Sequence, residues 1–228
     1  MNIRSHIFFL SVIVFTARCA IADGSPARTD QQKVDVVGAA YPLIDIVRET
    51  KDADAKWRAI RALGCLRYKA AVPLFIDCLK DEHPYVRSNA TRALCDMRIE
   101  NASGPLLRLL ETETNGGVIE QTSLALRCLN VREAVPQLKR LANHESSQTR
   151  IWILQAIGFL GSRADVPFLA KRLNAESETE QETAGRAIGN LVGIDFGFQE
   201  GSGIANPRPA IKRAQEWWEK NKAMFGSE

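Results

Sequence analysis

Residues 71–94 read AVPLFIDCLKDEHPYVRSNATRAL, two amphipathic segments joined by a polar corner. The first segment begins at Pro73, which suits the first turn of a helix because the N–H that proline lacks has no partner there. The second segment places apolar side chains on one stripe at helical spacing: Val86, Ala90, Ala93 and Leu94. The stretch therefore predicts a hairpin of two helices.

The same pattern recurs five times along the chain. Prolines at a nearly constant interval mark it: Pro42, Pro73, Pro105, Pro136 and Pro167. At one fixed distance after each proline, an alanine precedes an aliphatic residue: Ala62-Leu63, Ala93-Leu94, Ala125-Leu126, Ala156-Ile157 and Ala187-Ile188. One hairpin cannot bury its apolar stripe alone, whereas stacked hairpins bury it for each other. We therefore predict an all-α fold, an α-solenoid of about five helical hairpins with a C-terminal capping helix.

This repeat resembles the HEAT-repeat family, in particular its short bilin-lyase-like subclass. The stretch quoted above and AVPQLKRLANHESSQTRIWILQAIGFLG (134–161) carry the resemblance best. The arginine that the family places near the start of the second helix is matched by Arg87 and Arg150, and conservatively by Lys56. Repeats three and five depart from it, with Ile119 and Gln181. The resemblance implies that the second helices line a concave face.

The chain divides into four predicted regions. Residues 1–22 read as a secretory signal peptide, with Arg4 before an apolar run at 7–17 and small residues before a cleavage site after Ala22. That run is too short for a membrane span. Three further regions follow: an N-terminal linker or cap (23–39), the repeat array (40–193), and a loop with an aromatic capping helix (194–228).

The signal peptide predicts an exported bacterial protein that is periplasmic or secreted. A lipoprotein anchored at Cys19 is the alternative, which Arg18 disfavours because such sites require a small residue before the cysteine. Without residues 1–22, which include Arg4 and Arg18, 28 lysines and arginines face 27 acidic residues, and no basic block remains. The charge pattern therefore argues against nucleic acid or an anionic membrane as the partner.

Both ends of the array are predicted to carry caps. Apolar residues at helical spacing indicate that the first helix begins well before Pro42: Val34, Val37, Tyr41, Ile44 and Val47. At the other end, the final amphipathic helix carries Trp217, Trp218 and Phe225. These aromatic side chains are predicted to cover the last apolar stripe, because terminal units of a solenoid need a polar outer face.

No catalytic or metal-binding constellation emerges from the sequence. His83 and His144 fall in the polar corners between helices, where a solvated turn is the favoured interpretation. His144-Glu145 is a single His-Glu pair, whereas the HEAT-like deoxyhypusine hydroxylases bind two irons through repeated pairs, so we reject that function. We predict no catalytic residue, no metal site and no cofactor.

Four cysteines remain after the predicted cleavage: Cys65, Cys78, Cys95 and Cys128. Cys65 and Cys128 occupy the same repeat position two units apart, which is beyond disulfide reach. Cys65–Cys95 or Cys95–Cys128 are the pairings that could bridge adjacent second helices. The favoured interpretation is that all four are small apolar fillers.

A helical wheel directs three positions of each second helix away from the core, those that Asp54, Trp57 and Arg61 hold in repeat one. In repeat two they include Tyr85 and Arg92, and together with Trp57 and Arg61 these side chains have a composition typical of interface hot spots. Trp57 and Arg61 are i, i+4 neighbours and are expected to stack. In later repeats the positions hold Glu120, Leu124, Ile151, Gln155, Glu182 and Arg186.

The predicted partner-binding residues are Trp57, Arg61, Tyr85, Arg92 and Leu124. Packing of Trp57 against the N-terminal segment, as part of the cap, is the alternative role for that side chain. We predict a non-catalytic scaffold or adaptor of the cell envelope that displays its concave surface to a protein or peptide.

Two alternative functions stay open beside the scaffold. The resemblance implies a bilin-lyase-like or chromophore-handling protein, whose cytosolic chemistry the signal peptide disfavours. A structural envelope subunit without a discrete ligand is the other alternative. The partner's identity and the oligomeric state are left open.

Overall fold

The structure is a computed structural model that describes residues 30–198 and 206–226, with side chains from residue 36 onwards. Within those ranges the chain forms helices and turns without any strand, so the predicted all-α solenoid is confirmed. None of the described helices is both long enough and apolar enough to span a bilayer. The predicted signal peptide, its cleavage site and Cys19 lie outside the described residues.

Five hairpins and one further helix make up the described part of the chain. The first helices of the hairpins are α2 (Asp30–Glu49), α4 (Val72–Cys78), α6 (Ser103–Thr112), α8 (Val135–Leu141) and α10 (Val166–Ala170). The second helices are α3 (Ala53–Cys65), α5 (Pro84–Asp96), α7 (Gly116–Cys128), α9 (Ser147–Leu160) and α11 (Glu178–Val192). The last helix is α12 (Arg208–Asn221), and short 3-10 turns precede α4, α6, α8 and α10.

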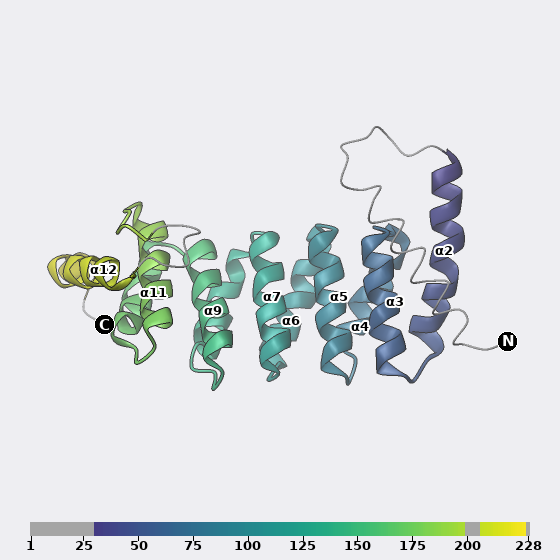
Figure 1. Cartoon of the computed structure of the whole chain (residues 1–228), viewed down its shortest axis with the longest axis horizontal. Helices are drawn as coiled ribbons and strands as arrows, with labels where there is room; N and C mark the ends of the chain where they lie inside the picture. Colours follow the sequence, from purple (N-terminus) through teal and green to yellow (C-terminus); the bar gives the residue numbers. More distant parts are fainter. Residues whose placement is uncertain (1–29, 199–205, 227–228) are drawn as a thin grey trace. The chain divides into compact units, whose positions relative to one another are not determined.

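The described residues form two compact units, which divide between Ala102 and Ser103. In the first unit, α3 lies between α2 and α5, and α4 packs against α5 (Figure 1). In the second unit, α9 lies between α7 and α11, and α12 packs against α11 (Figure 1). Within each unit, neighbouring second helices therefore run side by side and bury each other's apolar stripe.

Each second helix begins at a residue whose side chain accepts a hydrogen bond from a backbone N–H of the first turn. These N-cap residues are Asp52, His83, Asn115, Ser146 and Ser177. Such caps satisfy donors that a helix start otherwise leaves without a partner. The imidazole Nδ1 of His83 does this for the N–H of Tyr85, at 3.3 Å. The prediction that His83 marks a corner between helices is confirmed.

The repeated alanine allows second helices to approach closely. A Cβ placed on Gly64 would lie 3.0 Å from the Cβ of Ala93, and one on Gly158 would lie 2.5 Å from the Cβ of Ala187. Both glycines occupy the same position of their repeats, opposite the alanine of the next repeat. The contact between these small residues brings the backbones of adjacent helices together. The neighbouring aliphatic residues, such as Leu94, are fully buried.

Helix α2 begins at Asp30 and continues through Pro42, so the predicted early start of the first helix is confirmed. Its buried face agrees with the predicted stripe at Val47 and differs from it before that residue. Val37 and Tyr41 are exposed, whereas the buried residues are Ala40, Leu43 and Val47. The face that meets α3 runs through Ala40 and Leu43, the residues next to the predicted Tyr41 and Ile44.

Helix α12 caps α11 mainly through small and aliphatic side chains. Its buried residues are Ala210, Ile211 and Ala214. Trp217, Trp218 and Phe225 are half-buried: Trp217 meets Phe196 and Phe225 edge-on, with ring centroids 5.8 and 6.0 Å apart. The aromatic residues therefore close the rim of the cap, and smaller side chains fill its centre.

Three second helices end in the same left-handed turn, at Arg67, Arg98 and Asn130, with φ of 52°, 53° and 55°. At Arg98, the N–H of Ile99 donates to the carbonyl of Leu94, and the N–H of Arg98 donates to that of Cys95. This is the Schellman arrangement, in which glycine is the favoured residue. An arginine there carries a steric penalty that glycine lacks.

Arg98→Gly is expected to raise the free energy of unfolding by about 1 kcal/mol, because the left-handed conformation costs a residue with a Cβ about that much. Urea unfolding of the two proteins measures the difference. Gly193, which ends α11 at φ 76°, provides the matched control: Gly193→Ala is expected to lower stability by a similar amount. A loss of stability in Arg98→Gly contradicts the steric explanation.

Candidate functional site

The corner of repeat two is held by the helix-start arginine. The guanidinium of Arg87 donates to the carbonyls of Asp81 and Glu82, at 2.8 and 2.9 Å. The carboxylate of Asp81 in turn accepts a hydrogen bond from Nζ of Lys56 in the preceding repeat, at 2.8 Å. Lys56 and Arg87 therefore tie consecutive repeats to one corner, which is a structural role.

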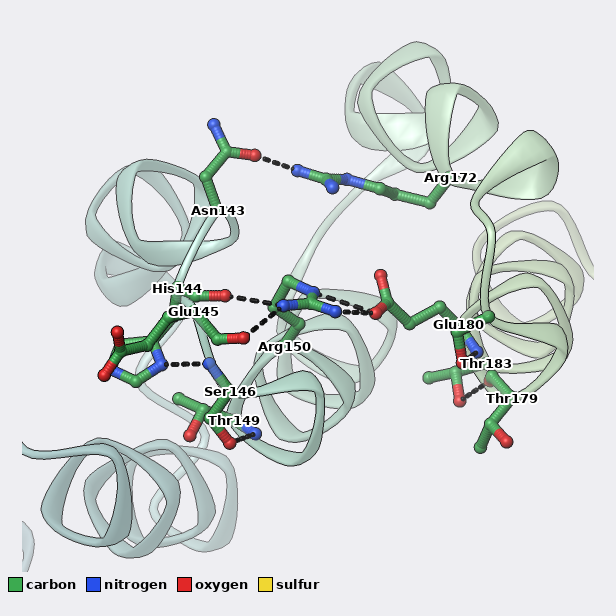
Figure 2. Close-up of polar contacts among 11 residues, drawn as sticks. Asn143, His144, Glu145, Ser146, Thr149, Arg150, Arg172, Thr179, Glu180 and Thr183 are labelled. Carbon is green, nitrogen blue, oxygen red and sulfur yellow. Dashed lines mark hydrogen bonds and ion pairs between the residues drawn. The ribbon is translucent and has the colours of Figure 1, made fainter.

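Repeat four uses the same device with a buried acid (Figure 2). Nη1 of Arg150 donates to the carbonyls of His144 and Glu145, both at 2.8 Å. Its Nε and Nη2 donate to one carboxylate oxygen of Glu180, at 2.8 and 2.5 Å. Glu180 is 3% exposed. The hydrogen bond to this carboxylate raises the pKa of Arg150.

Repeat five has Gln181 in place of the arginine, and this glutamine still forms one hydrogen bond to a corner carbonyl. Nε2 of Gln181 donates to the carbonyl of Ala175, at 2.6 Å. Arg87 and Arg150 reach carbonyls at the same spacing along the chain. In repeat three Ile119 is instead fully buried, and the carboxylate of Glu113 accepts the backbone N–H groups of that corner, at 2.9 and 3.1 Å.

His144 is committed to structure as well. Its Nδ1 accepts the N–H of Ser146 at 3.1 Å, and its Nε2 lies 3.2 Å from the carbonyl oxygen of Thr114. Both ring nitrogens are therefore engaged within the protein. No group of three or more potential metal-ligating side chains occurs in residues 36–198 and 206–226.

Two corner carboxylates predict how stability depends on acid. Burial alone would raise the pKa of Asp165, but hydrogen bonds from Lys139 and from the Ser162 backbone outweigh it and hold that pKa below its ordinary 3.8. Asp81 behaves alike, with Lys56 and the backbone of His83 as donors. A carboxylate whose pKa is lowered in the folded protein stabilises the fold at neutral pH. This contribution is lost as the pH falls, because the same carboxylate takes up its proton at a higher pH in the unfolded chain than in the folded protein.

Asp165→Asn is therefore expected to lower stability at neutral pH and to flatten the decline of stability between about pH 5 and pH 2. Urea unfolding across that range checks this. Asp77→Asn removes an exposed carboxylate and is the control that should keep the wild-type slope. An unchanged slope in Asp165→Asn contradicts the assignment of this acid dependence.

In the first unit, the predicted binding residues lie on the side of the second helices that points away from the core. Tyr85 is 65% exposed, and Arg61 and Arg92 are exposed. Trp57 is half-buried, and its Nε1 donates to Asp54 at 3.0 Å. The cation over the Trp57 ring is Arg58, 5.3 Å from the centroid, in the place predicted for Arg61. The i+1 residue reaches the ring because the indole turns toward Asp54, away from the next helical turn.

Arg92 pairs with Asp96 one turn later on the same helix, at 3.7 Å, and both side chains are 61% exposed. An exposed pair of this length contributes little to stability. The guanidinium of Arg92 therefore stays accessible to a partner.

In the second unit, the sides of α7, α9 and α11 that point away from the core form an open groove of about 330 Å³. Its lining residues are Arg127, Ile151, Gln155, Phe159, Thr179, Glu182, Thr183, Arg186, Ala187 and Asn190. Four of them, Ile151, Gln155, Glu182 and Arg186, are positions that the helical wheel directed away from the core. Leu124 is half-buried on α7 and is not among the lining residues.

The helical wheel missed two residues of this groove, Arg127 and Phe159. They follow Leu124 and Gln155 by one helical turn, just beyond the positions that were read. Phe159 is 58% exposed, and Arg127 places its guanidinium 5.9 Å from the centre of the ring. Extending the wheel by one helical turn would have included both.

No disulfide joins the four described cysteines, so the alternative pairings are not formed. Cys78 and Cys95 are buried, as fillers are expected to be. Burial, and then the charge of Asp81, raises the pKa of Cys78 to about 11. Cys65 and Cys128 are exposed, which corrects their prediction as fillers. They share the outer repeat position that Phe159 holds in repeat four.

Comparison with known proteins gives a family and a fold. The chain resembles one chain of the solved complex of CpcE and CpcF of phycocyanin lyase from Nostoc sp. PCC7120, with 16% identity and a TM-score of 0.50 over 86% of this chain and 97% of that chain. It also resembles an engineered protein, with 17% identity and a TM-score of 0.53 over 79% of this chain and 96% of the other. Such identities establish likeness of fold alone.

None of the curated protein sequences matches the chain. The sequence profile of HEAT repeats matches residues 40–127 and 106–189, which together cover most of the chain and include parts of all five hairpins. The chain therefore belongs to the HEAT-repeat family.

Proposed function

We propose that this protein is a non-catalytic protein-binding scaffold of the bacterial cell envelope, and that its partner binds the concave face lined by the second helices. HEAT repeats are typically protein-interaction modules, which supports a binding role. The observation that carries the proposal is the exposure of large aromatic side chains on second helices of both units. Tyr85 is 65% exposed and Phe159 58% exposed, although neither is needed to cover the core.

The use of the polar groups supports a non-catalytic role. Catalysis by a histidine needs a base within hydrogen-bond reach of a reacting group. The Nδ1 of His83 instead caps α5, and the Nδ1 of His144 accepts the backbone N–H of Ser146 in the corner before α9. Arg87 and Arg150 bind corner carbonyls. These side chains maintain the repeats, which leaves the exposed second-helix residues for recognition.

A capture experiment with the first-unit surface tests this function. Tagged wild type, Trp57→Ala and Arg92→Ala are used to capture proteins from the periplasmic fraction of the source organism. The wild type is expected to retain a partner that both variants retain less well, and Arg108→Ala, on an exposed position of α6, should behave as wild type. Equal recovery by all four proteins, or a Trp57→Ala effect confined to thermal stability, contradicts the assigned surface.

The envelope location has its own test. When the protein is purified from the periplasmic fraction, its N-terminal residue is expected to be Asp23. An N-terminus at Cys19 that carries lipid would support the lipoprotein alternative, and a chain that begins at Met1 in the cytosol would contradict export.

A bilin-lyase-like function is the second candidate, supported by the likeness of fold to the phycocyanin lyase subunits. The sequence identity to that structure is 16%, so the likeness supports a shared fold and does not by itself support a shared activity. Expression in a host that makes linear tetrapyrroles separates the two functions. The scaffold is expected to purify without visible absorbance, and a bound pigment would favour the alternative.

A further inference from the structure

The groove of the second unit is lined by one exposed aromatic ring and by several polar side chains. Phe159 projects from α9 with 58% of its surface exposed, and α11 supplies the polar lining residues Thr179, Thr183 and Asn190. An aromatic ring of this exposure offers a large apolar contact at low cost in side-chain entropy. The groove therefore provides a place for one apolar side chain of a ligand.

The charges of the groove are unequal. Arg186 donates through Nε and Nη2 to Glu182, at 3.1 and 2.9 Å, and through Nη1 to the carbonyl of Phe198. Arg127 contacts the ring of Phe159, and across the described ranges 30–198 and 206–226 it has no ion pair. Among the lining residues Glu182 is the one acid beside two arginines. A positive charge therefore remains, and it is located at Arg127.

Two amides add hydrogen-bonding groups of both kinds. Gln155 and Asn190 are exposed side chains on α9 and α11, and each lines the groove. A carboxamide both donates and accepts, which matches the N–H and C=O groups of an extended peptide backbone. The groove is open to solvent, as binding of a peptide requires.

We propose that this groove recognises an extended acidic segment of the partner protein, with a carboxylate of Asp or Glu on Arg127 and an adjacent apolar side chain on Phe159. The inference rests on the proposed scaffold function and specifies the chemistry of the partner. A guanidinium binds a carboxylate through two parallel hydrogen bonds, so a single acidic side chain satisfies the remaining charge. Leucine or a similar side chain next to it covers the exposed ring.

Peptide titration by NMR tests the proposal on the full mature chain. The probe is the capped peptide Ac-Ser-Leu-Glu-Leu-Ser-NH2, with analogues that carry glutamine for glutamate or serine for both leucines. The parent peptide is expected to shift the amide signals of residues on α9 and α11. Each analogue is expected to bind about tenfold more weakly, which corresponds to about 1.4 kcal/mol.

Variants locate the site. Arg127→Gln is expected to bind the parent peptide about tenfold more weakly and to lose the preference for glutamate over glutamine. Phe159→Ser is expected to lose the preference for leucine over serine. Arg140→Gln, on an exposed position of α8, should bind as wild type. Urea unfolding of each variant confirms that the fold is retained.

Each remaining outcome contradicts the inference. Equal binding of the glutamate and glutamine peptides, signal shifts confined to other helices, or no shift at about 5 mM peptide would exclude the proposed recognition. Capture of a partner that depends on Trp57 and Arg92 would still stand in those cases. Failure of the groove and failure of the scaffold function are therefore distinguishable.

Discussion

Gly158→Leu is expected to lower the free energy of unfolding by about 3 kcal/mol, the upper end of what overpacking costs. A Cβ at this position would lie 2.5 Å from the Cβ of Ala187 and 2.7 Å from its Cα. The second of these atoms belongs to the backbone of α11, so a side chain can be accommodated only if the helices move apart. Urea unfolding monitored by circular dichroism measures the loss.

Two substitutions show whether the close approach causes this loss. Gly158→Ala is expected to destabilise as well, although alanine is the better helix former, because even a methyl group meets Ala187. Gly104→Ala, in the first turn of α6, adds a Cβ whose nearest neighbour is the flexible end of Arg108, at 3.6 Å. That control should be neutral or slightly stabilising. A stable Gly158→Leu protein would contradict the packing of α9 on α11.

Glu180→Ala is expected to cost about 3 kcal/mol, as breaking one side of a buried ion pair does. The alanine leaves the guanidinium of Arg150, whose side chain is 22% exposed, with two carbonyls and without the carboxylate that balances its charge. The same change removes a side-chain link between repeats four and five. Chemical unfolding at neutral pH measures the cost.

A double-mutant cycle isolates this pair. Arg150→Met alone is expected to be destabilising, and Arg150→Met combined with Glu180→Leu is expected to recover much of the stability, because apolar residues of similar volume can replace a buried pair. Additive single effects in the cycle would contradict a direct interaction between the two side chains.

The sequence predicts the repeat and its packing because their signals are regular. Prolines that begin first helices, and alanines that meet the next helix, recur at fixed spacing. The period of the α-helix then determines which residues are buried. Ile153, Ile157 and Leu94 occupy the core as that period requires.

The differences arise where local geometry overrides the pattern. Arg67 and Arg98 adopt a left-handed conformation that arginine does not favour, so no residue type marks those turns. Gln181 forms the hydrogen bond to a corner carbonyl that an arginine forms in repeats two and four. The buried face of α2 includes Ala40, whose small side chain gives a weak apolar signal.

The candidate surface could be predicted in part. The wheel gave the outward direction of Tyr85, Gln155 and Arg186, which the structure leaves unburied. The wheel could not show how far the ring of Phe159 is exposed, because that exposure depends on how α9 and α11 pack together. The place of Arg58 over Trp57 depends likewise on the rotamer of the indole, which a helical wheel does not include.

Site-specific photo-crosslinking tests the central claim most directly, that the partner binds the second-helix face. A photoreactive phenylalanine analogue is placed at Arg61, Arg92 or Gln155 on second helices, and at Arg108 or Arg140 on first helices, all exposed positions. After irradiation in the source organism, the second-helix positions are expected to yield adducts of one common mass, and the first-helix positions none. Adducts formed equally from both faces, or only from Arg108 and Arg140, would contradict binding at the second-helix face.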